Sequence, residues 1–328
     1  MRTLRRVIAF AATLVFVVVV PVAPRARAAD PSSLLDAVVG VHTEIPAEAR
    51  TAAFLGRTRD GSGVLIDDAG LIVTIGYLIT EAMAAEVTTV SGKVSRADII
   101  GFDIASGLGL LRATDPLRVK PIALGSAKEL AEKTPVVIAG HTGPGRAQPA
   151  SVVSRRTFAG YWEYLLDDAV FTAPPVAAWS GAALIAPGGR LAGIGSLIVS
   201  DADGQSPGNM FVPIDLLLPV MGDLMALGRP SSARPWLGAN MQDADGKIVV
   251  RRVAPEGPAD RAGIQHGDRI TAIDGSEVHD LAVLYRALWA QGEPGTIVRL
   301  SVRRGDEERE IEVKTIDRYR YLKLDTTY

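Results

Sequence analysis

The sequence contains no cysteine among its 328 residues. This absence excludes disulfide bonds, thiolate metal ligands and a cysteine nucleophile. Only 5% of the residues are aromatic, so the core has to be built from Val, Ile, Leu and Ala. The net charge of −2 comes without a basic stripe, which argues against nucleic-acid binding. The four histidines lack ligand spacing with carboxylates and no phosphate loop is present, so we expect neither a metal nor another cofactor.

The composition is nevertheless that of a globular protein. Hydrophobic residues make up 48% of the chain and charged residues 22%, which leaves ample apolar surface for a core. At roughly 150 residues per domain, this length predicts two domains.

Residues 1–28 have the pattern of an export signal. Three arginines lie within the first six residues, a mostly apolar run covers 7–20, and Ala26-Arg27-Ala28 provides a small-x-small cleavage site. The apolar run is shorter than the roughly 17–25 residues of a membrane span. We therefore expect cleavage and an extracytoplasmic, periplasmic or secreted protein with a net charge of −7, from 30 basic and 37 acidic residues. An uncleaved membrane anchor is the alternative.

Residues 29–227 are expected to form the first domain. GVLIDDAGLIVTI predicts two strands around an Asp-Asp-Ala-Gly turn, and ALIAPGGRLAGIGSLIV predicts a hairpin around Pro-Gly-Gly. Many short strands with frequent turns favour an all-β barrel or sandwich. The helical spacing over 215–227 predicts a closing helix that ends at Gly228.

The second domain is expected over residues 236–316, after a Gly-, Ser- and Pro-rich linker at 228–235 and before a C-terminal tail at 317–328. Its strands alternate with a short helix and with LAVLYRALWA (281–290), whose spacing predicts an amphipathic helix.

WLGA (236–239), AGIQHGDRITAIDG (262–275) and the helix that follows make this domain resemble a PDZ domain of secreted bacterial proteases. PDZ domains bind the C-termini of other chains by adding them as a strand to a sheet edge. The resemblance implies a nest of backbone N–H groups for the terminal carboxylate, formed by Trp236, Leu237, Gly238 and Ala239. It also places on the groove helix, facing either the peptide or the core, Leu281, Leu284, Tyr285 and Leu288.

The first domain resembles the HtrA family of trypsin-like serine proteases, through GSGVLI (61–66), VTIGY (73–77), GFDIASGLGLLR (101–112), AWSGAALI (178–185) and FVPID (211–215). The resemblance implies a trypsin-like double β-barrel followed by a PDZ domain, a mainly β fold with an α+β second domain. It places Tyr77 at the position of the catalytic histidine, Gly107 at that of the aspartate and Ser180 at that of the serine.

These replacements predict the loss of ordinary catalysis. A serine hydroxyl is a weak nucleophile until a base takes its proton, and a tyrosine with a pKa of about 10 donates protons at pH 7. Gly107 has no side chain to orient a base. Loss of the base costs about 10⁶-fold in turnover in a well-studied serine protease, although about 10³–10⁴ over water can persist.

The oxyanion hole is altered as well. The resemblance places Ala178 at a glycine position whose N–H group forms part of that hole, Trp179 at an asparagine and Ala182 at a glycine. If the backbone at 178 needs a positive φ, alanine costs about 1 kcal/mol or more.

We considered substitutes for the missing base. His141, in AGHTGPG, is the main candidate; its alternative interpretation is a loop histidine bonded to backbone. Lys128 and Lys133 are further candidates, but their polar surroundings indicate solvated side chains. Asp103 corresponds to a turn residue of the family. The remaining histidines are expected on an early strand and in the second domain, at His42, His266 and His279.

The sequence therefore predicts an exported HtrA-like pseudoprotease whose PDZ domain binds protein C-termini or unfolded polypeptides as a scaffold or regulator. Ser180 is then a remnant nucleophile. The alternative is a weak serine endopeptidase that uses Ser180 with a non-standard base in extracytoplasmic protein quality control. The resemblance also implies homo- or hetero-oligomers with HtrA-like subunits.

Overall fold

The computed structural model describes residues 31–141 and 146–323. The predicted export signal at 1–28 lies outside these residues. No helix within the described ranges is long and apolar enough to cross a membrane.

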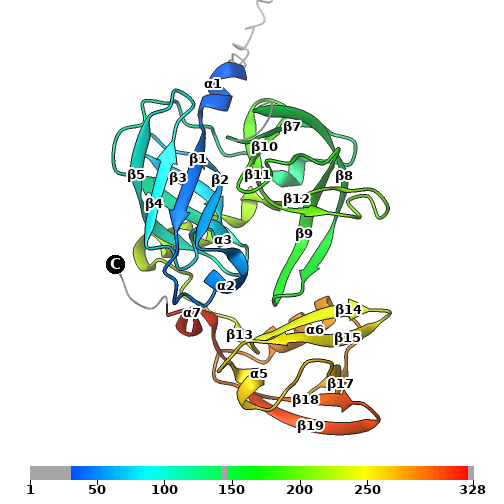
Figure 1. Cartoon of the computed structure of the whole chain (residues 1–328). Coiled ribbons are helices and arrows are strands. Elements are labelled where there is room, and N and C mark those ends of the chain that lie inside the picture. The colour runs from blue at the N-terminus through cyan, green and yellow to red at the C-terminus, as the bar shows by residue number, and fades with distance from the viewer. Residues whose placement is uncertain (1–30, 142–145, 324–328) are drawn as a thin grey trace, which may run out of the picture.

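The first unit is a closed six-stranded barrel (Figure 1). Short helix α1 (Pro31–Asp36) precedes it, and α2 (Ala52–Leu55) and α3 (Gly76–Ile79) lie between its strands. Its antiparallel strands follow the order β1-β2-β3-β6-β5-β4, with β1 (Val38–Glu44), β2 (Thr58–Leu65), β3 (Leu71–Ile75), β4 (Ala84–Thr88), β5 (Val94–Phe102) and β6 (Leu108–Ala113).

The turn between β2 and β3 shows how the sequence dictates the local fold. The Asp67 carboxylate accepts a hydrogen bond from the Leu71 N–H at 2.7 Å, and Gly70 takes a positive φ of 86° that most residues avoid. The side chains of the strand that follows alternate between the two faces of the sheet, and both Ile72 and Val73 are fully buried.

The second unit is another closed six-stranded barrel, reached through the 3₁₀-helix η1 (Ala127–Glu129). Its order is β10-β11-β12-β9-β8-β7, with β7 (Pro135–Ala139), β8 (Ala147–Gly160), β9 (Tyr164–Ala173), β10 (Ala183–Ala186), β11 (Arg190–Val199) and β12 (Gly208–Pro213). η2 (Ile214–Leu216) and α4 (Leu218–Leu227) close the domain, and α4 ends at Gly228 in the left-handed conformation, as the pattern predicts.

The hairpin of β8 and β9 is longer than its neighbours. β8 has 14 residues and β9 has 10, and their tip reaches from the barrel to the C-terminal domain (Figure 1).

The C-terminal domain is a sheet with two main helices beside it. The strand order is β14-β15-β16-β18-β19, so β14 lies at one end. The elements are β13 (Pro235–Trp236), β14 (Ala239–Ala244), β15 (Lys247–Val253), α5 (Pro258–Arg261), β16 (Arg269–Ile273), β17 (Ser276–Glu277), α6 (Leu281–Ala290), β18 (Ile297–Arg304), β19 (Glu307–Lys314) and β20 (Ile316–Asp317). Asp280 caps α6 by accepting a hydrogen bond from the Val283 N–H at 2.7 Å.

The first residues of the expected C-terminal tail are structured. Asp317 belongs to β20, which pairs with β13, and residues 318–321 form α7 (Arg318–Tyr321). The buried Tyr319 hydroxyl donates to the Phe102 carbonyl at 3.1 Å and accepts from the Ile104 N–H at 2.9 Å. This segment therefore attaches the C-terminal domain to the first barrel (Figure 1).

Candidate functional site

Ser180 lies in a loop that packs closely on β2. The Ser180 carbonyl accepts a hydrogen bond from the Ser62 N–H at 2.8 Å. Gly181 has φ 70°, and a Cβ atom there would lie 1.9 Å from the Ser62 carbonyl oxygen. A Cβ atom on Gly61 would lie 2.9 Å from Ser180 Oγ. The glycines of the GSG and SGA motifs therefore permit the two barrels to meet at the serine.

Tyr77, in the first turn of α3, reaches this serine. Its hydroxyl oxygen lies 2.9 Å from Ser180 Oγ and 3.1 Å from the Ser196 carbonyl oxygen on β11. Burial raises the pKa of Tyr77 to about 12, against an opposing effect of its hydrogen bond to Ser180. The phenol is therefore neutral at pH 7 and cannot draw the proton from the serine.

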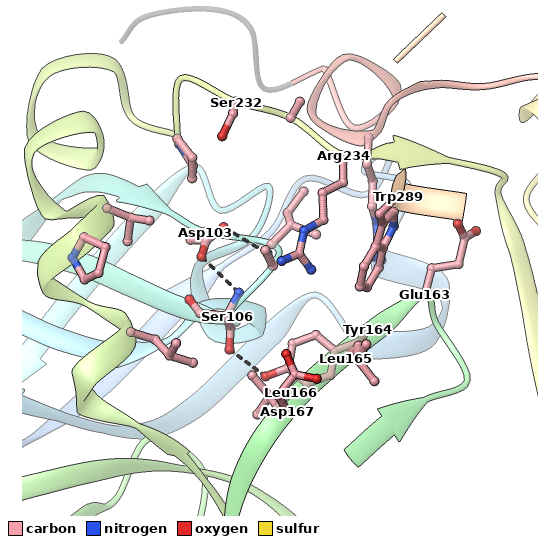
Figure 2. A pocket seen from close by; sticks show the side chains of 18 of the residues that line it. Asp103, Ser106, Glu163, Tyr164, Leu165, Leu166, Asp167, Ser232, Arg234 and Trp289 are labelled. Carbon is pink, nitrogen blue, oxygen red and sulfur yellow. Dashed lines mark hydrogen bonds between the residues drawn. The ribbon is translucent and has the colours of Figure 1, made fainter. Parts of the chain in front are cut away.

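Gly107 sits beside α3, where its carbonyl accepts from the Gly76 N–H at 2.7 Å. Its φ is 80°, and a Cβ atom there would lie 3.1 Å from the Tyr164 hydroxyl oxygen. That hydroxyl donates to the Ser106 carbonyl at 2.5 Å, as Figure 2 shows. Tyr164 of β9 thus occupies the space next to Gly107. The Asp103 carboxylate accepts from the N–H groups of Ala105 and Ser106, both at 2.9 Å, and stabilises this turn.

The residues on either side of Ser180 in its loop also shape the site. The Trp179 indole donates to the Ser196 carbonyl at 3.2 Å, so that Trp179 and Tyr77 converge on one acceptor. Ala178 does not take a positive φ, so its methyl group brings no backbone strain. Ala182 is fully buried in the second barrel. A cavity of about 760 Å³ lies alongside, lined by residues that include Tyr77, Trp162 and Trp179.

The side chains considered as substitute bases either have partners elsewhere in the fold or are exposed to solvent. The imidazole of His141 lies against Gly40 of β1, within 2.6 Å of where a Cβ atom would stand, and burial lowers its pKa. Lys128 and Lys133 are exposed. His42 pairs with Asp60 at 2.7 Å, and the His266 ring lies 2.8 Å from the Arg251 carbonyl oxygen. His279 lies 3.4 Å from the Asp280 carboxylate.

The predicted carboxylate-binding loop contains a carboxylate from the chain itself. The Glu163 side chain accepts hydrogen bonds from the N–H groups of Leu237 at 2.9 Å, Gly238 at 2.7 Å and Ala239 at 3.0 Å. Gly238 has φ 80°, which directs the successive N–H groups toward one point. Trp236, the first loop residue, is buried in β13, and its ring centroid lies 4.6 Å from that of Tyr321.

Burial dominates the titration of Glu163. It raises the pKa of this carboxyl to about 7, and the three N–H donors and the positive charge of Arg318 oppose the shift.

The four groove-helix residues belong to the core of the C-terminal domain. Leu284, Tyr285 and Leu288 are fully buried and Leu281 is nearly so. Tyr285 also faces the hairpin, because its hydroxyl donates to the Gly160 carbonyl at 2.8 Å. The sequence analysis missed Glu163 and Tyr164. The aromatic-rich YWEY at 161–164 is their only local signal, since both partners lie far away in the chain.

Within residues 31–141 and 146–323, no group of three or more His, Asp or Glu side chains could hold a metal ion.

Two family models match the chain, one on the domain formed by the barrels and one on the C-terminal domain. Residues 61–194 match the trypsin-like peptidase domain, and residues 235–315 match the PDZ domain. The chain is 28% identical over 281 residues to the chloroplastic Protease Do-like 1 of Arabidopsis thaliana, covering 77% of this chain and 62% of the relative. It is 27% identical over 272 residues to the periplasmic pH-dependent serine endoprotease DegQ of Escherichia coli, covering 78% and 59%. The chain thus spans about three fifths of these relatives.

Solved structures share the fold over most of the chain. The HtrA-type protease AlgW, solved with a decapeptide, has a TM-score of 0.55 at 21% identity and covers 87% of this chain and 97% of its own. The serine endoprotease from Yersinia pestis has a TM-score of 0.52 at 23% identity, with the same 87% and 97% coverage. The mainly β fold class is confirmed. In fold, the chain has a trypsin-like double barrel followed by a PDZ domain, as these HtrA-type structures do.

Proposed function

We propose that this chain is an HtrA-like pseudoprotease that binds protein C-termini or unfolded segments through its PDZ domain and does not cleave them. The observation that carries this proposal is the contact of the Tyr77 hydroxyl with Ser180 Oγ. A phenol with a pKa of about 12 stands where the resemblance implies an imidazole. Without a base, Ser180 remains a weak nucleophile.

The binding half of the proposal is supported by the loop at 237–239. Its three N–H groups already hold one carboxylate, that of Glu163, so their geometry suits a carboxylate ligand. A terminal carboxylate of another chain offers the same two oxygens. The neighbouring β14 lies at the end of its sheet, where a peptide can be added as a strand.

The test uses two versions of one labelled peptide, with a free C-terminal carboxylate and with a C-terminal amide. We expect the full chain to bind the free peptide and to lose at least about tenfold in affinity for the amide, because the amide removes the charge-assisted hydrogen bonds. Equal affinities would refute recognition through this loop.

The alternative is a weak serine endopeptidase. Its support is the retained Ser180 at the junction of the two barrels, together with relatives that are named as proteases. It predicts slow casein cleavage by the pure protein that disappears in Ser180→Ala. The pseudoprotease proposal predicts no difference between these two proteins.

The site of action follows from the N-terminal sequence. We infer an extracytoplasmic location from the signal-like residues 1–28, with a scaffold or regulatory role in protein quality control. Assembly with HtrA-like subunits as homo- or hetero-oligomers belongs to the same proposal, with the barrel domain as the contact surface.

A further inference from the structure

The tip of the β8–β9 hairpin lies in the groove of the PDZ domain. Figure 2 shows Glu163, in the turn just before β9, with its carboxylate directed away from the neighbouring Tyr164. This carboxylate occupies the N–H groups of Leu237, Gly238 and Ala239. Glu163 is only 5% exposed, so it is an inserted group rather than a surface contact.

The hairpin backbone is also hydrogen bonded to the edge of the PDZ sheet. The Met241 N–H on β14 donates to the Tyr161 carbonyl at 2.8 Å. From Tyr161 to Glu163 the hairpin chain therefore runs in the direction opposite to that of residues 238–241. A C-terminal peptide added to this edge, with its carboxylate in the loop before β14, has the same direction.

The opposite wall of the groove holds the tip as well. The Tyr285 hydroxyl on α6 donates to the Gly160 carbonyl at 2.8 Å and accepts from the Glu163 N–H at 3.3 Å. Arg318 of α7 donates to the Trp162 carbonyl at 3.0 Å. Thus three successive carbonyl groups of the tip and the Glu163 carboxylate all accept hydrogen bonds from the C-terminal part of the chain.

Apolar packing completes the contact. Leu165, two residues after Glu163, is 7% exposed and belongs to the hydrophobic core of the PDZ domain, together with Leu284 and Tyr285. The hairpin therefore supplies a carboxylate in the loop, a backbone hydrogen bond to the sheet edge and a buried apolar side chain, all of which a PDZ ligand also supplies.

We propose that the hairpin tip, residues 160–163, is an internal ligand of the PDZ groove, and that a partner's C-terminus binds only by displacing it. This inference rests on the proposed function, since it takes the groove to be the site for C-termini. The same three N–H groups cannot hold both carboxylates. A tethered ligand acts at an effective concentration on the order of millimolar, so an external peptide has to compete with it.

The test measures binding of a fluorescein-labelled peptide that ends in Tyr-Trp-Val with a free carboxylate, a probe built on the Tyr161-Trp162 sequence. Glu163→Ala removes the internal carboxylate from the full-length protein. We expect it to tighten peptide binding about tenfold or more, because the binding-competent fraction rises. Tyr285→Phe, which loses two hydrogen bonds to the tip but keeps the ring, should tighten binding by a smaller factor.

Asp167→Ala is the matched control. Asp167 is an exposed carboxylate on the same hairpin that pairs with Arg286 of α6 at 2.5 Å, but it does not enter the loop. Exposed pairs contribute little, so we expect less than about a twofold change. Circular dichroism of each variant establishes that it is folded.

Hydrogen exchange of residues 236–242 gives a readout that needs no peptide. We expect faster exchange in Glu163→Ala than in the wild type or in Asp167→Ala. Peptide binding that is equally tight in wild type and Glu163→Ala would overturn the internal-ligand proposal while the proposed function stands. If exchange is faster in Glu163→Ala but no variant binds the peptide, the proposal that the groove captures C-termini would be overturned. Displacement of the hairpin tip by a C-terminus would fall with it. Unchanged exchange would show that the hairpin does not protect the loop.

Discussion

The hydroxyl oxygen of Tyr164 lies 3.1 Å from the point where a Cβ atom on Gly107 would stand. The tyrosine comes from β9 in the second barrel, and the glycine precedes β6 in the first. Gly107 stands where the resemblance places the catalytic aspartate. A side chain there is disfavoured in two ways, by the left-handed backbone and by the Tyr164 ring, which has its own hydrogen bond.

This relationship predicts the effect of Gly107→Asp. A residue with a side chain at φ 80° costs of order 1–3 kcal/mol, and the Tyr164 hydroxyl has to move as well. We expect the free energy of unfolding, measured with urea, to fall by about 2 kcal/mol or more. Gly204→Asp is the control, because Gly204 has φ 90° but open space around its Cβ position. An equal loss in the two variants would contradict a steric role for Tyr164.

The contact between Tyr77 and Ser180 predicts different outcomes for two substitutions. Tyr77→His places an imidazole, with a pKa near neutrality, at the position of the phenol. We expect it to give slow modification of Ser180 by a fluorophosphonate, with a rate above that of the wild type. Tyr77→Phe removes the hydroxyl without supplying a base and should not react. Modification of the phenylalanine variant would mean that another group activates the serine.

The shifted pKa of Glu163 predicts how peptide binding depends on pH. Burial raises this pKa from 4.5 to about 7, so the docked hairpin binds a proton that the released hairpin gives up between these values. Docking is therefore strengthened as the pH falls through 7, and peptide affinity should drop on the order of tenfold from pH 8 to pH 5. The carboxylate of the free peptide, with a pKa of about 3.5, is ionised over this range.

The groups facing Glu163 are Tyr285 from α6 and Arg318 from α7. Both keep one charge state over this pH range, since burial raises the pKa of Tyr285 and an arginine stays protonated. Glu163→Ala should therefore give an affinity that is nearly constant between pH 8 and pH 5. A wild-type affinity that rises as the pH falls would reverse the sign of this coupling.

Much of the fold could be predicted from the sequence because its signals are local. The Asp67 turn and the Gly228 helix end each depend on residues a few positions apart. The double barrel is implied by the family resemblance, through motifs such as GSGVLI (61–66) and AWSGAALI (178–185). The Glu163 contact is different. It joins residues about 75 positions apart, and nothing in YWEY indicates that its carboxylate enters a distant loop. The length of β8 and β9 decides the contact, and that length is set by pairing along the whole hairpin.

The central claim is that Ser180 is not activated as a nucleophile, and labelling with a fluorophosphonate tests this claim most directly. The pure protein would be incubated with the probe at several pH values from 6 to 10 and weighed by intact mass, beside Ser180→Ala and an active trypsin-like protease. Because burial raises the pKa of Tyr77 to about 12, the phenol stays almost entirely protonated in this range, and we predict no added mass at any pH. Addition of one probe that is lost in Ser180→Ala would contradict the account and show an activated serine.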